Sequence, residues 1–215
     1  MASLVKICGL STPEAVNSAL TGGASFLGFM FFEKSPRNVT PQAAGRLAAG
    51  AKSSNARTVA VTVDPSNERL DEIMRGLAPD LIQLHGRETP ARVREVKGRT
   101  GAEVIKVIPV STTLEIAVAG RDYDTVADYL MFDAKPPADS ELPGGNGVAF
   151  DWDILHGVRL ERPWFLAGGL DPWNVGEAIK RSGAKMVDVS SGVERGAGLK
   201  DPALIAAFLA AARRD

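Results

Sequence analysis

Short apolar runs rich in β-branched residues recur down the chain, and each is followed by a turn and then by an amphipathic stretch rich in Ala and Leu. Runs of this kind are typical of buried strands, and the stretches between them are typical of helices. The alternation predicts strands and helices in turn along the whole chain. We count eight such runs, which begin at Leu4, Phe26, Thr58, Leu81, Val104, Tyr129, Trp164 and Met186.

The stretches between the runs carry helix start signals, in which Ser, Thr or Asp precedes a Pro or Glu near the first helical position. These signals are Ser11-Thr-Pro-Glu, Thr40-Pro-Gln, Ser66-Asn-Glu, Thr89-Pro-Ala, Asp171-Pro-Trp-Asn and Asp201-Pro-Ala. Eight βα units in 215 residues take about 27 residues each, which suits a compact (β/α)8 TIM barrel with short helices. We therefore predict one α/β barrel domain over residues 1–215.

The main rival fold is a doubly wound open sheet, which usually has five or six strands and often a G-x-G-x-x-G turn after the first. The first run here ends in Lys6-Ile-Cys-Gly-Leu, which lacks that turn, and no linker or low-complexity tract divides the chain. The longest irregular segment, residues 134–148, contains three Pro and three Gly residues. It follows the sixth run, and loops of this length are often functional.

Composition narrows the class of partner. The chain has 25 Lys and Arg against 26 Asp and Glu, a formal net charge of −1. A basic excess or a basic amphipathic helix would indicate a nucleic-acid or membrane partner, and neither stands out. We therefore expect a small-molecule partner, no nucleic acid and no membrane.

The first residues lack a signal peptide, no apolar run could span a bilayer, and a lone cysteine cannot form an intramolecular disulfide. The expected location is the cytoplasm.

The active site of a βα barrel lies at the carboxyl ends of its strands, so the residues that close each run are the candidates. They comprise a thiol, an arginine, an imidazole, several carboxylates and two glycine-rich turns. These candidates are Cys8, Gly9, Phe31, Arg37, Asp64, His85, Gly86, Pro109, Asp133, Gly168, Gly169, Ser190, Ser191 and Gly192.

Two late turns indicate a phosphate site. Ala167-Gly-Gly-Leu follows the seventh run and Ser190-Ser-Gly-Val-Glu follows the eighth. In this fold, those two loops commonly bind phosphate through backbone amides. One Gly-Gly pair alone can equally make a tight turn, but turns in both loops favour phosphate. Gly144-Gly-Asn-Gly adds a possible third set of amides, and no P-loop motif is present.

The candidates for proton transfer are Cys8 and Asp133. Cys8 closes the first run beside Lys6, whose charge would favour a thiolate, although an unpaired cysteine is more often a small buried hydrophobe. Asp133 closes the sixth run, where a partly desolvated carboxyl can serve as a general acid; an exposed loop cap is the alternative.

Three further residues at strand ends have weaker signals. Arg37 can grip a planar carboxylate with two hydrogen bonds, or can be a solvated surface arginine. His85 is placed to touch a substrate, and Asp64 can point to the same mouth or cap the following helix. His156, the second histidine, is expected to be structural or exposed. With two distant histidines and no Cys/His cluster, we expect no catalytic metal.

Taken together, these motifs resemble the phosphoribosylanthranilate isomerase family of tryptophan biosynthesis. The Gly-Gly turn is generic to phosphate-binding barrels, but K-I-C-G together with Q-L-H-G and D-V-S-S-G-V-E is specific. One departure is Asn146, which stands where the family usually has Thr or Ser, so a side-chain hydroxyl is lost and the backbone amides remain. The matches run in order along the chain: Lys6-Ile-Cys-Gly-Leu, Ser35-Pro-Arg, Gln83-Leu-His-Gly, Phe132-Asp, Gly144-Gly-Asn-Gly, Phe150-Asp-Trp, Leu166-Ala-Gly-Gly-Leu and Val187-Asp-Val-Ser-Ser-Gly-Val-Glu.

The resemblance implies the Amadori rearrangement of N-(5-phosphoribosyl)anthranilate to 1-(2-carboxyphenylamino)-1-deoxyribulose 5-phosphate, without a cofactor. It matches the general base to Cys8, the general acid to Asp133 and the anthranilate-carboxylate contact to Arg37. The other residues expected to bind substrate are Lys6, Gln83, His85 and Asp188, and those expected to bind phosphate are Gly145, Gly147, Gly168, Gly169, Ser190, Ser191 and Gly192. We expect a monomer or a homodimer.

One acid and one base suffice for this reaction. Opening the furanose needs a proton on the ring oxygen, and the resulting Schiff base must then lose a proton from C2. These roles need a thiolate at Cys8 and a carboxyl at Asp133 that a desolvated setting keeps protonated. The alternatives are another phosphosugar barrel, such as an indole-glycerol-phosphate synthase or lyase, and a non-catalytic phosphosugar-binding barrel. The first leaves the K-I-C-G motif unexplained, and the second leaves Cys8 and Asp133 without a role.

Overall fold

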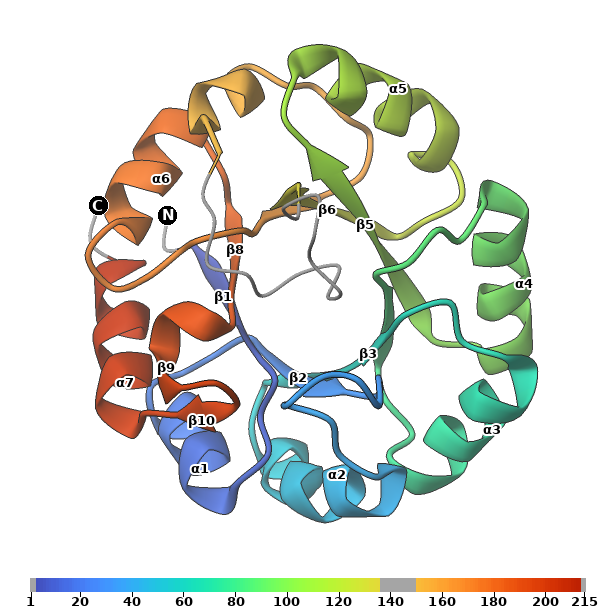
Figure 1. The fold of residues 1–215 in the computed structure, drawn as a ribbon, viewed down its shortest axis with the longest axis vertical. Coiled ribbons are helices and arrows are strands. Elements are labelled where there is room, and N and C mark those ends of the chain that lie inside the picture. Colours follow the sequence, from blue (N-terminus) through green and yellow to red (C-terminus); the bar gives the residue numbers. More distant parts are fainter. Residues whose placement is uncertain (1–2, 136–149, 214–215) are drawn as a thin grey trace.

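Eight parallel strands close into a barrel in chain order, and β8 pairs with β1 to complete the ring (Figure 1). The structure, a computed structural model, describes residues 3–135 and 150–213. Each of the eight predicted runs forms one strand, so the TIM barrel is confirmed and the open sheet is excluded. The strands are β1 Leu4–Cys8, β2 Phe26–Met30, β3 Arg57–Thr62, β4 Leu81–Leu84, β5 Glu103–Val110, β6 Tyr129–Ala134, β7 Trp164–Leu166 and β8 Met186–Val189.

Helices form an outer ring around the barrel (Figure 1). Most of them begin where the sequence predicts: Thr12, Thr40, Ser66 and Thr89 each accept a backbone N–H from the first turn of the helix that follows. The α-helices of the described residues are α1 Pro13–Thr21, α2 Pro41–Leu47, α3 Asn67–Gly76, α4 Pro90–Thr100, α5 Thr113–Tyr123, α6 Val175–Ser182 and α7 Pro202–Ala211. Short 3-10 helices are η1 Ala48–Ser53, η2 Trp152–Leu155 and η3 Ser191–Val193.

The helix pattern differs from the predicted alternation in three places. Helix α5 follows a Thr112–Glu115 capping box that was not among the predicted signals. Helix α6 begins at Val175, later than expected, because Asp171 accepts the N–H groups of Trp173 and Asn174 and so forms a turn of its own. In the described residues between β6 and β7, the helical element is the short η2.

Two apolar layers hold the barrel together. An outer layer packs the strands against the helices, and a separate inner cluster fills the barrel with residues such as Val59, Ile105 and Met131. Near the amino ends of the strands, the rings of Phe26 and Phe165 meet edge to face with centroids 5.2 Å apart. This aromatic floor leaves the carboxyl ends of the strands for polar groups.

A two-stranded hairpin follows η3 and was not predicted. It pairs β9 Glu194–Gly196 with β10 Leu199–Lys200 in antiparallel fashion, so Glu194 stands opposite Lys200. At its turn, Gly198 has φ +77°, and a Cβ there would lie 2.7 Å from the carbonyl oxygen of Pro36. The hairpin therefore rests on the loop that follows β2. In the part of the chain described, no helix has the length and apolar character needed to cross a membrane. The single-domain organisation of residues 1–215 stays a prediction.

Candidate active site

Lys6 and Asp188 form an ion pair inside the barrel, on paired positions of β1 and β8. Lys6 Nζ donates to Asp188 Oδ1 at 2.8 Å, and both side chains are buried. Gly28 on β2 leaves room for the ammonium, because a Cβ there would lie 3.1 Å from Lys6 Nζ. Burial by itself lowers the pKa of Lys6, but Asp188 and Cys8 outweigh that effect and raise it. Lys6 is therefore a buried, charged ammonium two residues before Cys8 on the same face of β1.

Cys8 is the last residue of β1 and belongs to the inner cluster. Burial raises the pKa of the Cys8 thiol; the charges of Lys6 and Lys200 lower it, Asp188 raises it, and the net change is upward. Lys6 therefore favours the thiolate, as expected, but burial outweighs it in the free protein. Sequence proximity indicated the neighbouring charge but not the loss of hydration.

A second buried charge network stands beside the thiol and joins the loop after β2 to the hairpin. Arg37 donates through Nε and Nη2 to the two carboxylate oxygens of Glu194, at 2.7 and 2.8 Å. Lys200 donates to Glu194 at 2.6 Å and to the backbone oxygen of Ser190 at 2.9 Å. Burial opposes the charge on Glu194, but Arg37 and Lys200 outweigh it and hold the pKa of that carboxyl below its usual range. Burial also lowers the pKa of Lys200 in spite of Glu194.

Arg37 is buried rather than a surface arginine. Its Cδ lies over the turn after β1, where a Cβ on Gly9 (φ +75°) would be 2.6 Å away, so that turn requires glycine. Because Glu194 accepts from Nε and from one hydrogen of Nη2, the edge formed by Nη1 and Nη2 is the one that the described residues leave for a substrate carboxylate. Neither Glu194, which ends the Val187-Asp-Val-Ser-Ser-Gly-Val-Glu motif, nor Lys200, which precedes Asp201-Pro-Ala, was predicted to take part in the site.

Asp133 and His85 meet across the mouth from β6 and the end of β4. Asp133 Oδ1 accepts the Ala134 N–H at 2.8 Å, and Oδ2 lies 3.3 Å from His85 Nε2. Gln83 Nε2 lies 3.3 Å from the other ring nitrogen of His85. Gly168 (φ +87°) lets the loop after β7 pass close by, since a Cβ there would lie 2.8 Å from Asp133 Oδ1.

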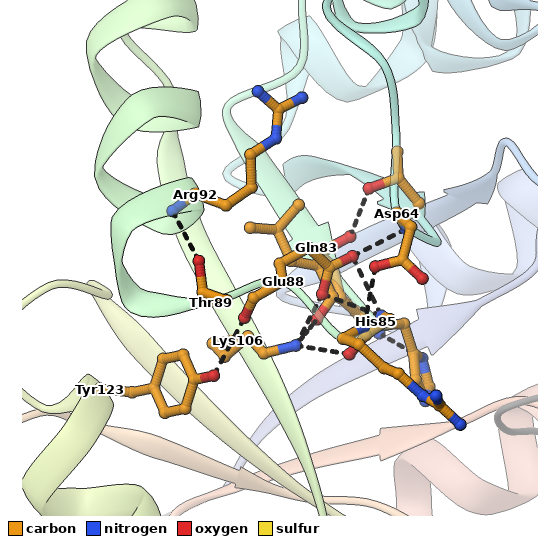
Figure 2. A network of polar contacts seen from close by, with 12 residues as sticks. Asp64, Gln83, His85, Glu88, Thr89, Arg92, Lys106 and Tyr123 are labelled. Carbon is orange, nitrogen blue, oxygen red and sulfur yellow. Dashed lines mark hydrogen bonds and ion pairs between the residues drawn. The ribbon is translucent and has the colours of Figure 1, made fainter.

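A buried network on this side was also missed at the sequence level (Figure 2). Lys106 of β5 pairs with Glu88 at 2.7 Å, with both side chains almost fully buried. Asp64 joins them through its backbone N–H, which donates to Glu88 at 2.9 Å, and Ser66 caps α3 in its place. A lysine inside the apolar run that begins at Val104 is the signal that could have predicted a buried partner.

The two candidate phosphate loops pack directly on each other. A Cβ on Gly192 would lie 1.9 Å from the Leu170 carbonyl oxygen, so only glycine fits this contact. Asn174 holds the first loop by donating to the Gly169 carbonyl oxygen at 2.8 Å. The hydrogen bonds of the described residues leave the backbone N–H groups of Gly169, Ser191 and Gly192 without an acceptor.

The predicted site residues thus gather at the carboxyl ends of the strands, on one face of the barrel. Gly168 and Gly169 follow β7, while Ser190, Ser191 and Gly192 follow β8. The remaining predicted phosphate contacts, Gly145 and Gly147, lie outside the described residues together with Asn146. Within residues 3–135 and 150–213, His, Cys, Asp and Glu side chains form no group of three or more that could hold a metal ion.

Comparison with known proteins identifies the family. The sequence profile of "N-(5'phosphoribosyl)anthranilate (PRA) isomerase" matches residues 5–211. An N-(5'-phosphoribosyl)anthranilate isomerase from Caulobacter sp. (strain K31) is 60% identical over 97% of this chain and 98% of its own. The crystal structure of the Thermotoga maritima isomerase is similar with a TM-score of 0.86 at 32% identity, over 98% of both chains.

A further isomerase structure, at 30% identity and TM-score 0.83 over 98% of both chains, was solved in complex with reduced 1-(o-carboxyphenylamino)-1-deoxyribulose 5-phosphate. These matches cover nearly all of the chain and agree with the barrel and with the motifs at its strand ends. The chain belongs to the N-(5'-phosphoribosyl)anthranilate isomerase family.

Proposed function

We propose that this chain rearranges N-(5-phosphoribosyl)anthranilate to 1-(2-carboxyphenylamino)-1-deoxyribulose 5-phosphate, with Cys8 as the general base and Asp133 as the general acid. Family membership supports the reaction. The observation that carries the residue assignment is the placement of a buried thiol on β1 and a buried carboxyl on β6 at the same end of one barrel. The family match does not favour a synthase, a lyase or a non-catalytic barrel.

Two sets of donors are available for the two anionic groups of this substrate. The N–H groups of Gly169, Ser191 and Gly192, which have no acceptor among residues 3–135 and 150–213, suit the phosphate. The free edge of Arg37 suits the anthranilate carboxylate, because two N–H groups of a guanidinium can bind both carboxylate oxygens. The relative solved with a reduced deoxyribulose phosphate carries both groups on its ligand.

Cys8 and Asp133 each carry one proton transfer in this chemistry. Asp133 gives its proton to the furanose ring oxygen, the C1–O bond breaks, and the nitrogen lone pair forms the C=N bond of the Schiff base. The Cys8 thiolate then takes the C2 proton, the C–H electrons form a C1=C2 bond, and the C=N electrons return to nitrogen. The resulting enaminol becomes the ketone when C1 takes up a proton through the C1=C2 electrons and the C2 hydroxyl loses its proton, so that the O–H electrons form the C2=O bond. The raised pKa of Cys8 makes the thiolate a minor form of the free protein. The charges of Lys6 and Lys200 lower that pKa and so increase the share of thiolate available as the base.

Steady-state kinetics with the aminoaldose substrate test the assignment. Cys8→Ala and Asp133→Asn should each lower kcat by ~10² to 10⁴, the range for one lost proton transfer. The reduced deoxyribulose phosphate should still bind, because neither group is assigned to the phosphate or the carboxylate. His156→Gln, on the exposed end of η2, is the control and should change neither constant. Near-native kcat in a folded Cys8→Ala variant would return the thiol to a packing role.

The cytoplasmic location, the absence of a cofactor and the monomeric or homodimeric state stay predictions. Of these, the oligomeric state is directly measured by sedimentation of the purified chain.

A further inference from the structure

Both ring nitrogens of His85 face protein groups. Nδ1 lies 3.3 Å from Gln83 Nε2, and Nε2 lies 3.3 Å from Asp133 Oδ2. The ring therefore stands between an amide of β4 and a carboxyl of β6. With both nitrogens engaged in this way, His85 has no ring nitrogen left for the substrate contact that the sequence suggested.

The amide of Gln83 determines which nitrogen of His85 carries the proton. Gln83 is 1% exposed, and its Oε1 has no hydrogen-bond partner among the described residues. Its Nε2 can only donate, so the facing Nδ1 must accept and carry no proton. The proton of the ring is then on Nε2, the nitrogen that lies 3.3 Å from Asp133 Oδ2.

With this tautomer, the carboxyl of Asp133 has one N–H hydrogen-bonded to it and a second N–H nitrogen close by. The backbone N–H of Ala134 reaches Oδ1 at 2.8 Å, and His85 Nε2 faces Oδ2. Both donors favour the ionised carboxylate, which is the state that Asp133 reaches after it has protonated the ring oxygen. Donors fixed in advance toward a developing charge lower the barrier to the step that creates it.

The buried pair of Lys106 and Glu88 fixes the backbone on either side of His85 (Figure 2). Lys106 Nζ donates to the carbonyl oxygens of Leu84 and Gly86, at 3.4 and 2.8 Å. Glu88 accepts the N–H of Gly86 at 3.0 Å. The residues before and after His85 are thus both tied to the ion pair, which limits how far the ring can move from Asp133.

We infer that Gln83 and His85 are positioning residues: Gln83 fixes the tautomer of His85 that carries its proton on Nε2, and His85 donates to Asp133 to stabilise the carboxylate that forms during ring opening. The inference rests on the proposed role of Asp133 as the general acid. It replaces a substrate contact at His85 and Gln83 with an action on the acid.

Kinetics separate the two roles. His85→Leu removes the donor and should lower kcat by about 10- to 100-fold with KM unchanged, the range expected for a hydrogen bond to a charged group. His85→Gln should restore most of kcat, because its amide NH₂ can stand where Nε2–H was. In an Asp133→Asn background, His85→Leu should have little further effect. A rise in KM at constant kcat would overturn the inference in favour of substrate binding.

Nitrogen-15 NMR reads the tautomer directly. The chain has two histidines, so His156→Gln leaves His85 as the one imidazole signal. We expect a bare Nδ1 and a protonated Nε2. Gln83→Glu should move the proton to Nδ1, where a carboxylate can accept it, and should lower kcat without raising KM. A wild-type ring protonated on Nδ1 would refute the tautomer assignment. Near-native kcat in Asp133→Asn would instead refute the proposed function, so the two failures are distinguishable.

Discussion

The two sides of the barrel mouth handle charge in different ways. Around Cys8, the cations Lys6 and Lys200 act on the thiol directly, and each is paired with a buried carboxylate. Around Asp133, the contacts are a backbone N–H and the imidazole of His85. The buried ion pair on that side fixes backbone groups instead. We call these the base side and the acid side of the mouth.

The difference indicates what each group needs. A thiol in the barrel interior is held protonated by burial, so charge must be close to it to make a base available. A carboxyl that starts protonated and ends ionised needs hydrogen-bond donors at a fixed distance. A permanent cation nearby would lower its pKa, so that it would lose its proton before the reaction begins. Direct charge suits the base side, and rigid dipoles suit the acid side.

Breaking each ion pair is expected to have the largest effect. Lys6→Met and Lys106→Met should each cost about 3 to 5 kcal/mol in the free energy of unfolding, because each leaves a carboxylate buried without its partner. Urea denaturation measures this cost. The double variant Lys6→Met/Asp188→Leu should recover most of it, since a well-packed apolar pair can replace a buried ion pair.

Lys106→Met combined with Glu88→Leu should recover little, because Glu88 also accepts the backbone N–H groups of Asp64 and Gly86. Equal recovery on both sides would remove the distinction between direct charge and backbone anchoring.

Loosening Arg37 should have a smaller effect and should appear in binding. Glu194→Gln keeps the shape of the side chain but removes the negative charge that both Arg37 and Lys200 contact. Substrate binding should weaken by about 1.5 kcal/mol, the lower bound for a hydrogen bond to a charged group, which is about tenfold in KM. The control is Glu177→Gln on the exposed face of α6. A fall in kcat at constant KM would show that Glu194 acts on the base instead.

The pKa of the lone cysteine reports whether a lysine on either side of the mouth acts on the thiol. The pKa of Cys8 is raised by burial, so the thiolate absorbance of the folded protein, measured against Cys8→Ser, should appear only above the ordinary thiol range. Lys6→Met should raise that pKa further, whereas Lys106→Met should leave it unchanged. Because the folded pKa is above the unfolded one, the associated stability is complete below the unfolded pKa and is lost as pH rises through the folded pKa.

An exposed ion pair should show the smallest effect. Glu115 at the start of α5 contacts Lys135, and together with the Ser111 N–H this contact lowers the pKa of Glu115 to about 2. Glu115→Gln should cost no more than about 1 kcal/mol, since solvent screens such pairs. The stabilisation should be present above the unfolded pKa of about 4.3 and disappear as pH falls through the folded value. Thermal unfolding over that range checks it, and a cost comparable to that of Lys6→Met would contradict the contrast with the buried pairs.

The barrel and its catalytic face follow from local sequence patterns. Alternating runs and turns specify strands and helices, and one topological rule then brings all strand ends to one face. Cys8, Asp133 and Gly192 could be placed in this way without knowledge of any long-range contact. Helix α6 shows the limit, because a turn closed by Asp171 and Asn174 uses the residues that would otherwise start the helix.

The partners of the site residues could not be predicted in the same way. Glu194 reaches Arg37 only because β9 and β10 fold back onto the loop after β2, and no periodic pattern encodes that return. The pKa of Cys8 depends on how completely the barrel buries it. Lys6 and Lys106 lie inside apolar runs, which is a visible signal that each has a buried partner. The sequence does not say which carboxylate pairs with each lysine.

The separation of partners along the chain sets an order of assembly during synthesis. Lys106 lies 18 residues from Glu88, whereas Lys6 and Asp188 are 182 residues apart and Arg37 and Glu194 are 157 apart. At the usual ribosomal rate of about 5 to 20 residues per second, the first pair is complete within roughly 1 to 4 seconds, while Lys6 waits roughly 9 to 36 seconds for its carboxylate. A nascent chain therefore carries Lys6 without its carboxylate for most of its translation, and closure of the barrel by β8 is the event that both buries and pairs this lysine.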